Sequence, residues 1–427
     1  MTNLKKKINP LETILYYLII FFPIFFLLRS FALNFILIII SLIFLFLSFK
    51  IKYNYLYKKY NIFLLLFFFY VILLNFNLNQ NNESLVKSFF LLKFFFLFNA
   101  IIFVYSRIDK KFLKINLNYL FILILIISLD FFTQYITGQN FIGFKPSHCD
   151  INFENCQRYS GLFGSELVLG GYFSTVIFSF FLLLKIFKNG YISLFPIFIL
   201  VVVFLSGERS AFLLSLTFFL IFYSLTIKFN IRNIISVFFF IFISITTINF
   251  FAKDVTKARY YSDIKSLLNF DQPNLLETFK STPWGLHYEA SISIILDKPL
   301  FGNGLKSFRV KCKKYEKENI NKIKLRGYRV CSTHPHNFHL EILVDTGLFG
   351  YSLFLIFIFY LIKDLKKKDT NKKLILNLII LFIITFIFLP RPTGSIFSTF
   401  FGTIYWYFLG SLFGYYQLMR SKIKNFE

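Results

Sequence analysis

Apolar runs of near 20 residues recur along the whole chain, separated by short polar joints. A helical run of this length crosses the hydrocarbon core of a bilayer, which is about 30 Å thick. Hydrophobic residues make up 56% of the 427 residues, in keeping with this pattern. The pattern predicts an all-α, polytopic membrane protein with about twelve transmembrane helices, at residues 11–28, 31–49, 62–78, 88–105, 118–137, 166–184, 191–205, 211–227, 233–252, 339–362, 374–389 and 395–416.

Lysine and arginine gather in alternate joints, which sets the orientation because cationic segments resist translocation. One side holds most of the cations, including Lys5 to Lys7, Lys366 to Lys368 and, in the tail, Arg420, Lys422 and Lys424. We therefore predict that this side is cytoplasmic and that both termini lie on it. The net charge of +26 is mostly this lysine bias, so no nucleic-acid partner is expected.

One long polar loop interrupts the helices, and a segment of this length between two membrane helices is usually functional. We divide the chain into helices at 1–252, a periplasmic loop domain at 253–338 and helices at 339–427. From 253 to 333 the loop carries 16 Lys/Arg against 8 acidic residues. Such a surface attracts phosphate-bearing lipids or glycans. The competing explanation is compositional, because lysine is abundant throughout the chain.

All four cysteines fall on the predicted outer side, which suits an oxidising compartment such as a bacterial periplasm. Cys149 and Cys156 lie in one loop, and Cys312 and Cys331 in another. Of the three possible pairings we favour these two, since each closes a short local loop. Unpaired thiols are the alternative.

Within the long loop, residues 285–297 have the pattern of an amphipathic helix that ends before Pro299. The turn that follows contains Gly302 and Gly304 on either side of Asn303. Two such glycines permit positive φ and a close backbone approach. They are typical of either an anion-binding turn or a tight structural turn.

The candidate chemistry lies where this loop enters a membrane helix, in the run His334-Pro-His336-Asn337. Pro335 keeps His334 out of the α conformation, which predicts an extended segment with both rings on about the same face. Asn337 suits the N-cap of a helix beginning at Phe338. The positive end of the helix dipole then disfavours an imidazolium, so His336 is expected to be a neutral base. The same helix end favours a phosphate oxygen.

Three other interpretations of the histidines stay open. His334, His336, His339 and Cys331 are zinc-ligand types, but their spacing matches no closed structural set, so we predict no metal and no cofactor. The rings also suit the headgroup region of a bilayer, and this is the better reading of His339, which lies within the helix. A proton relay in a transporter is the third.

Arg209 lies in the barely polar joint Ser206-Gly-Glu-Arg-Ser210, on the same predicted outer face as His336. A lone arginine at such depth is costly unless it pairs with an anion. Pairing with Glu208 is the structural explanation. Binding a pyrophosphate is the functional one, and Arg209 is our first candidate for it.

These motifs together resemble the O-antigen ligase and polymerase superfamily. The resemblance rests on His334-Pro-His-Asn337, on Thr346-Gly-Leu-Phe-Gly350, on Pro299-Leu-Phe-Gly-Asn-Gly304 and on Ser206-Gly-Glu-Arg-Ser210, in the order that the family has. It implies a GT-C-like, metal-independent, inverting membrane glycosyltransferase that uses a glycan carried on a polyprenyl diphosphate. By this resemblance His336 activates the acceptor hydroxyl and Arg209 engages the diphosphate.

One departure from the family leaves a role unassigned. Members often carry a second loop arginine ahead of a tryptophan, whereas this chain has Lys280 ahead of Trp284. The alternatives are Arg309, Arg259, Lys280 and His287, and Arg309 is preferred because it lies beside the glycine turn. We also expect substrate contacts from His334, Asn337, Gly302 and Gly304.

The resulting prediction is a glycosyltransferase of the bacterial inner membrane with a periplasmic active site. It would move a glycan from undecaprenyl diphosphate to a lipid A-core sugar, as an O-antigen ligase does. The nearest alternative is a polymerase, whose acceptor is a second lipid-linked repeat unit. A lipid-linked glycan transporter is the remaining alternative, although no internal repeat supports it.

Overall fold

The structure is a computed structural model that describes most of the chain. The described residues are 10–28, 30–51, 53–78, 82–108, 110–147, 149, 156–164, 166–177, 195–226, 235, 238–239, 242, 245–246, 248–267, 279–280, 282–319, 331–366, 379–380, 383 and 394–422. Apart from one isolated bridge between Ser147 and Arg158, every regular element among them is a helix. The all-α prediction is therefore confirmed for this part of the chain.

The described helices fall into two groups along the chain. The first half contains α1 (Pro10–Ile20), α2 (Ser30–Ile51), α3 (Lys59–Asn77), α4 (Asn82–Phe90), α5 (Leu92–Tyr105) and α6 (Lys110–Thr137). The second half contains α8 (Phe195–Leu205), α9 (Arg209–Thr226), α11 (Asp254–Leu267), α13 (Pro283–Asp297), α14 (Phe308–Glu318), α16 (Phe338–Lys366) and α18 (Thr399–Lys422). Short 3₁₀ segments are η1 (Phe22–Leu27), η2 (Asn54–Tyr57) and η3 (Gly161–Phe163). Residues 169–177 are also helical.

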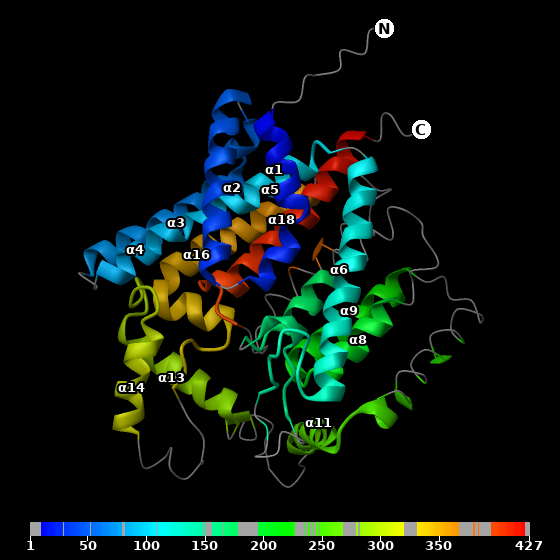
Figure 1. Ribbon diagram of the computed structural model, residues 1–427. Helices are drawn as coiled ribbons and strands as arrows, with labels where there is room; N and C mark the ends of the chain where they lie inside the picture. Colours follow the sequence, from blue (N-terminus) through cyan, green and yellow to red (C-terminus); the bar gives the residue numbers. More distant parts are fainter. Residues whose placement is uncertain are drawn as a thin grey trace.

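The centre of the bundle is α5, which packs against α2 on one side and along α18 on the other, while α16 runs along α3 (Figure 1). Aromatic rings fill this centre, because an all-apolar helix can bury every face. The buried Trp406 of α18 contacts the rings of Phe68, Phe98 and Phe357. In Figure 1, α11, α13 and α14 lie at the end of the molecule opposite the start of α1 and the end of α18.

Five helices of the described part of the chain are long and apolar enough to cross a membrane. They span Ser30–Lys50, Lys59–Asn77, Ser84–Tyr105, Phe112–Thr137 and Phe338–Leu365, and each matches a predicted span. The count of twelve stays a prediction, since the predicted spans at 166–184, 233–252 and 374–389 each lie partly outside the described residues. The division into 1–252, 253–338 and 339–427 stays a prediction as well.

Two predicted helices are interrupted, each at a residue that breaks regular geometry. The predicted helix 11–28 is wrong as one element: α1 ends at Ile20 and the 3₁₀ segment η1 follows, with Pro23 in its first turn. Proline lacks the N–H and its ring clashes with the preceding turn, so it ends an α-helix. The helix α16 is interrupted at Gly347, whose φ is 64° and ψ is −172°.

The long loop has a small apolar core of its own. Leu286, Ala290 and Ile294 of α13 pack on Phe308 and Cys312 of α14, and Val344 of α16 completes the cluster. The predicted helix at 285–297 is confirmed as α13, capped by the Thr282 hydroxyl, which accepts from Gly285 N at 3.2 Å. The loop helices are thus fixed to the first turns of α16, where the histidine motif lies.

Candidate active site

The segment 331–337 is an irregular turn that delivers two histidine rings to the start of α16. The Ser332 hydroxyl donates to the His334 carbonyl at 2.5 Å, and the ring centroids of His334 and His336 lie 4.1 Å apart. The backbone differs from the expected extended segment, because His336 has a φ of 56°. A left-handed conformation is uncommon at a residue with a side chain, and such residues cluster at functional sites.

Asn337 is the N-cap of α16, as the sequence predicts. Its Oδ1 accepts from the backbone N–H groups of His339 at 2.9 Å and Leu340 at 3.1 Å. Its Nδ2 donates to the Tyr288 hydroxyl on α13 at 3.0 Å. The cap therefore fixes the histidine turn to α13 as well as to α16, while a substrate contact by Asn337 stays a prediction.

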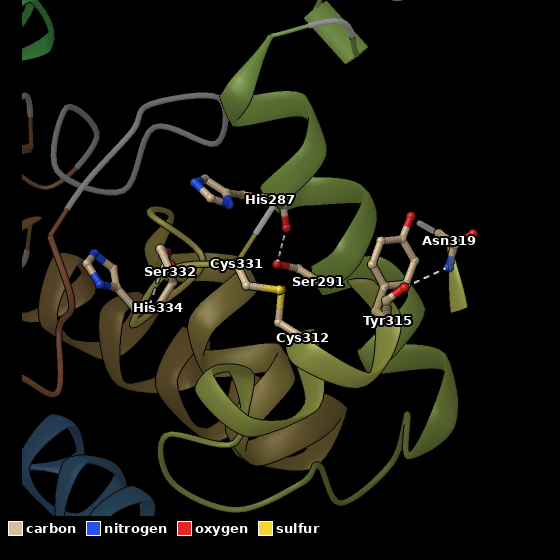
Figure 2. Close-up of a disulfide and its surroundings, with 8 residues drawn as sticks. All are labelled: His287, Ser291, Cys312, Tyr315, Asn319, Cys331, Ser332 and His334. Atoms are coloured by element: carbon tan, nitrogen blue, oxygen red, sulfur yellow. Dashed lines mark hydrogen bonds between the residues drawn. A yellow bond between two sulfur atoms is a disulfide. The ribbon is translucent and has the colours of Figure 1, made fainter. Parts of the chain in front are cut away.

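Rings from α13 and a disulfide surround the histidine turn. The rings of Trp284 and His287 each lie 5.2 Å from the His336 ring, centroid to centroid. Figure 2 shows His287 on α13 and His334 near the disulfide that joins Cys312 of α14 to Cys331. A second disulfide joins Cys149 to Cys156. These are the two pairings that the spacing of the cysteines favours.

The two histidines open onto a cavity of about 220 Å³. Its walls come from segments far apart in the sequence: the 158–175 region, the joint between α8 and α9, α13, the histidine turn and the start of α18. The residues that line it are Arg158, Leu167, Gly171, Thr175, Glu208, Ser210, Ala211, Trp284, His334, His336, Phe338, Gly394, Phe401 and Ile404.

Arg158 and Glu208 supply the charges in this cavity. An Nη of Arg158 lies 4.0 Å from the Glu208 carboxylate and donates to the Leu167 carbonyl at 3.3 Å. The carboxylate accepts from the N–H groups of Gly170 at 2.8 Å and Gly171 at 3.3 Å. Burial raises the pKa of Glu208, while Arg158 and the two amides act in the opposite direction. The Nε of Arg158 is buried without a hydrogen-bond partner, which costs about 1–3 kcal/mol in a folded protein.

Sequence reasoning overlooked Arg158. The available signal was its place two residues before the glycine-containing stretch Ser160-Gly-Leu-Phe-Gly164. No local pattern brings residue 158 to residue 336, because tertiary packing alone joins them.

Arg209 is the first residue of α9 and is half-buried. It lies between Glu208 and Ser210, which both line the cavity, but it is not itself among the lining residues. Arg209 is therefore adjacent in sequence to the cavity wall but is not part of it. Its role on the donor stays a prediction.

The other predicted cations are not among the residues found to line the cavity. Arg309 is exposed on α14, outside the cavity wall. Burial, followed by the charges of Lys87 and Arg309, lowers the pKa of its neighbour Lys306. Arg259 belongs to α11, and its side chain lies outside the described residues. Of the four alternatives for the unassigned family role, His287 lies in ring contact with His336.

The glycine turn, residues 299–304, lies against α16 rather than against the cavity. The N–H groups of Asn303 and Gly304 donate to the carbonyls of Val344 and Asp345 at 3.0 and 2.9 Å. In return, Leu348 N donates to the Pro299 carbonyl at 2.8 Å. These amides are already paired, so the geometry is that of a tight structural turn; substrate contact by Gly302 and Gly304 stays a prediction.

Gly302 and Gly347 make this contact possible. A Cβ on Gly302 would lie 2.4 Å from Gly347 N, and a Cβ on Gly347 would lie 2.5 Å from Gly302 N. Both distances are shorter than van der Waals contact. The interruption of α16 at Gly347 is therefore where the glycine turn docks, backbone against backbone.

Two further polar residues of α16 are engaged inside the protein. His339 is buried and its Nδ1 lies 2.7 Å from the Tyr351 hydroxyl. Glu341 accepts from the Ser395 hydroxyl at 2.5 Å and from Ile396 N at 2.9 Å, which ties α16 to the approach of α18. Within the described ranges, no three His, Cys, Asp or Glu side chains gather as a metal site would need.

Part of the chain matches a known protein family. Residues 194–355 match a protein-family model described as O-antigen ligase. The matched range includes Arg209, the glycine turn, the histidine turn and the kink at Gly347. No curated protein matches the chain.

Proposed function

We propose, from the match of residues 194–355 to the O-antigen ligase family model, that the chain is a member of the O-antigen ligase and polymerase superfamily and an O-antigen ligase-type glycosyltransferase. The donor is a glycan on undecaprenyl diphosphate, and the acceptor is a sugar of the lipid A core. The reaction takes place at the periplasmic face of the bacterial inner membrane, with both termini in the cytoplasm.

The observation that carries this proposal is that His336 and Arg158 face the same cavity. Transfer from a diphosphate needs a base for the acceptor hydroxyl and a positive charge for the leaving group. A cavity that joins an imidazole to a guanidinium offers both. Trp284 lies beside the imidazole, and an aromatic face of this kind packs well against a sugar ring.

The chemistry then follows in one step. The acceptor hydroxyl oxygen attacks the anomeric carbon from the face opposite the diphosphate, so the configuration inverts. The bond from the anomeric carbon to the diphosphate oxygen breaks, and its electron pair leaves with the diphosphate. The hydroxyl proton passes to the His336 ring. Arg209, next in sequence to Glu208 and Ser210 of the cavity wall, meets the negative charge that develops on the leaving group.

Membrane vesicles that contain the protein and a labelled lipid-linked glycan test this function. The expected result is a labelled glycan on added lipid A-core acceptor. Movement of the lipid-linked glycan across the vesicle membrane without a new glycosidic bond would instead make the protein a carrier.

The second candidate is a polymerase, since the matched family covers the same chemistry with a second lipid-linked repeat unit as acceptor. A deletion strain separates the two on a lipopolysaccharide gel. Loss of all glycan bands with accumulation of lipid-linked polymer identifies a ligase. A core that carries a single repeat unit identifies a polymerase.

A further inference from the structure

A second pocket lies between α3 and α16, at the ends of these helices that are remote from the histidine turn. Its volume is about 160 Å³, and it shares no lining residue with the histidine cavity. The side chains of its wall include three lysines and one acid, so the wall is cationic. The residues that line it are Lys58, Lys59, Tyr60, Tyr360, Lys363 and Asp364.

The acid in this wall is already engaged by other side chains. Lys58 Nζ lies 3.2 Å from Asp364 Oδ1, and Gln417 Nε2 donates to Asp364 Oδ2 at 3.2 Å. Lys59 and Lys363 are both exposed, and in the part of the chain that the structure describes neither forms an ion pair with a carboxylate. The pocket therefore carries positive charge that the described residues do not balance.

The ring of Tyr360 gathers these two lysines. Lys59 Nζ and Lys363 Nζ lie 5.5 and 6.0 Å from its centroid, which is the range of a cation–π contact. Tyr360 is itself stacked on Phe63 of α3, with the ring centroids 5.3 Å apart, so packing between the two helices fixes the ring. Two ammonium groups drawn toward one ring repel each other, and an anion bound near both would offset that repulsion.

The pocket lies where the headgroups of a bilayer would be. Lys59 begins the candidate membrane span Lys59–Asn77, and Lys363 lies two residues before the end of the span Phe338–Leu365. The ends of such spans reach the headgroup region, and the lysine bias predicts that this side is cytoplasmic. Basic pockets between membrane helices on that side bind anionic headgroups, because the leaflet there carries acidic lipids.

The two helices that form the pocket are also joined at their other ends. The Tyr70 hydroxyl of α3 lies 2.8 Å from the Phe301 carbonyl oxygen and 3.1 Å from that of Thr346, at the glycine turn. At the pocket the corresponding joint is the ion pair of Lys58 with Asp364. A ligand that contacts one lysine from each helix would strengthen this second joint.

We propose that this pocket binds the phosphate group of an anionic phospholipid, held by Lys59 of α3 and Lys363 of α16. The bound lipid joins the two helices at the membrane surface and stabilises the folded protein. Free phosphate has the same charge chemistry, but a pocket between the ends of two membrane spans is reached from the bilayer, which favours a lipid. The proposal does not depend on glycan transfer.

Lys50 and Lys114 supply a matched control. Both are exposed lysines of membrane helices, α2 and α6, on the side predicted to be cytoplasmic, and neither lines the pocket. Replacing both with glutamine removes as much charge as replacing Lys59 and Lys363. General attraction to acidic lipids should therefore fall equally in the two double variants, whereas binding in the pocket should fall in one.

The test uses the full-length protein in detergent. Native mass spectrometry measures the dissociation constants of phosphatidylglycerol, of zwitterionic phosphatidylcholine and of glycerol phosphate, and thermal unfolding measures the stabilisation by each. Phosphatidylglycerol should bind most tightly and raise the Tm of wild type. Lys59→Gln combined with Lys363→Gln should weaken its binding by about tenfold or more and remove most of the rise in Tm. Lys50→Gln combined with Lys114→Gln should match wild type.

Equal losses in the two double variants would overturn the proposal, because the attraction would then belong to the membrane surface as a whole. Equal binding of phosphatidylglycerol and phosphatidylcholine would overturn the requirement for an anionic lipid. Glycerol phosphate that binds as tightly as phosphatidylglycerol would make the ligand a free phosphate and overturn the assignment to a lipid. Should the double variant not fold, Lys363→Gln compared with Lys114→Gln carries the test, with an expected loss of roughly three- to tenfold.

Discussion

The glycine turn at 299–304 and the histidine turn at 331–337 both join the long loop to the first turns of α16. They differ in whether their polar groups are hydrogen-bonded within the protein or face a cavity. In the glycine turn the N–H groups of Asn303 and Gly304 are paired with carbonyls of α16. In the histidine turn the cap of Asn337 uses the helix end, while the rings of His334 and His336 face a cavity. The first contact holds the architecture, and the second is available for chemistry.

The largest expected effect on activity is at the histidine turn. His336→Ala should lower glycan transfer by about 10²- to 10⁴-fold, since general base catalysis supplies gains of that order. The amount of folded protein in the membrane should stay as in wild type, measured by fluorescence-detected size-exclusion chromatography. Normal lipopolysaccharide from this variant would remove the base assignment.

The largest expected effect on folding is at the glycine turn. Gly302→Ala should destabilise the protein by about 2–4 kcal/mol, because its Cβ would collide with Gly347 and its φ is +79°. Thermal unfolding in detergent measures this loss. Gly138→Ala is the control: Gly138 has a φ of +82° but nothing within 4 Å of a Cβ, so it reports the backbone cost alone. Equal losses in the two variants would mean that the close approach contributes nothing.

Arg209 tests whether the site extends beyond the cavity wall. Arg209→Lys should lower transfer by about tenfold, because a lysine does not reproduce the bidentate geometry of a guanidinium on phosphate. The donor KM should carry the change. Wild-type rates in this variant would mean that Arg209 has only a structural role.

The disulfide between Cys312 and Cys331 joins α14 to the start of the histidine turn, so it couples the two regions. Replacing both cysteines with serine should destabilise the loop by about 2–4 kcal/mol. Transfer should fall less than in His336→Ala, because Asn337 still caps α16. Loop stability is measured by limited proteolysis, and loss of activity equal to that of His336→Ala would show that the cap alone does not hold the rings.

The smallest effect is expected from metal removal. EDTA should leave transfer unchanged, since within the described ranges no group of three His, Cys, Asp or Glu side chains has an arrangement that could hold a metal ion. Activity that EDTA abolishes and zinc restores would contradict this and revive the zinc interpretation of the histidine turn.

Local patterns predicted the local features well. The apolar runs indicated five membrane helices that the structure contains, Asn337 followed from cap chemistry, and the cysteine spacing favoured both disulfide pairs. Each of these depends on residues near one another in the chain. Two local predictions failed: the helix predicted at 11–28 is interrupted near Pro23, and His336 has a left-handed backbone conformation. The pattern of apolar residues gives no information on the backbone angles of a single residue.

The contacts that could not be predicted from the sequence are those between residues far apart in the chain. Arg158 reaches the histidine cavity through packing of the 158–175 region against the joint before α9. Gly302 and Gly347 meet although 44 residues separate them in the chain. Both glycines stood in recognisable motifs, but a motif does not say whether its glycine faces a ligand or another backbone.

The contact between Gly302 and Gly347 also limits how this protein can vary. When two side chains collide, a smaller neighbour can relieve the clash, so paired changes are tolerated. At this contact the atoms that a Cβ would meet are backbone atoms, which every amino acid carries. No second substitution can therefore rescue either position, and a library randomised at both should return the glycine pair alone.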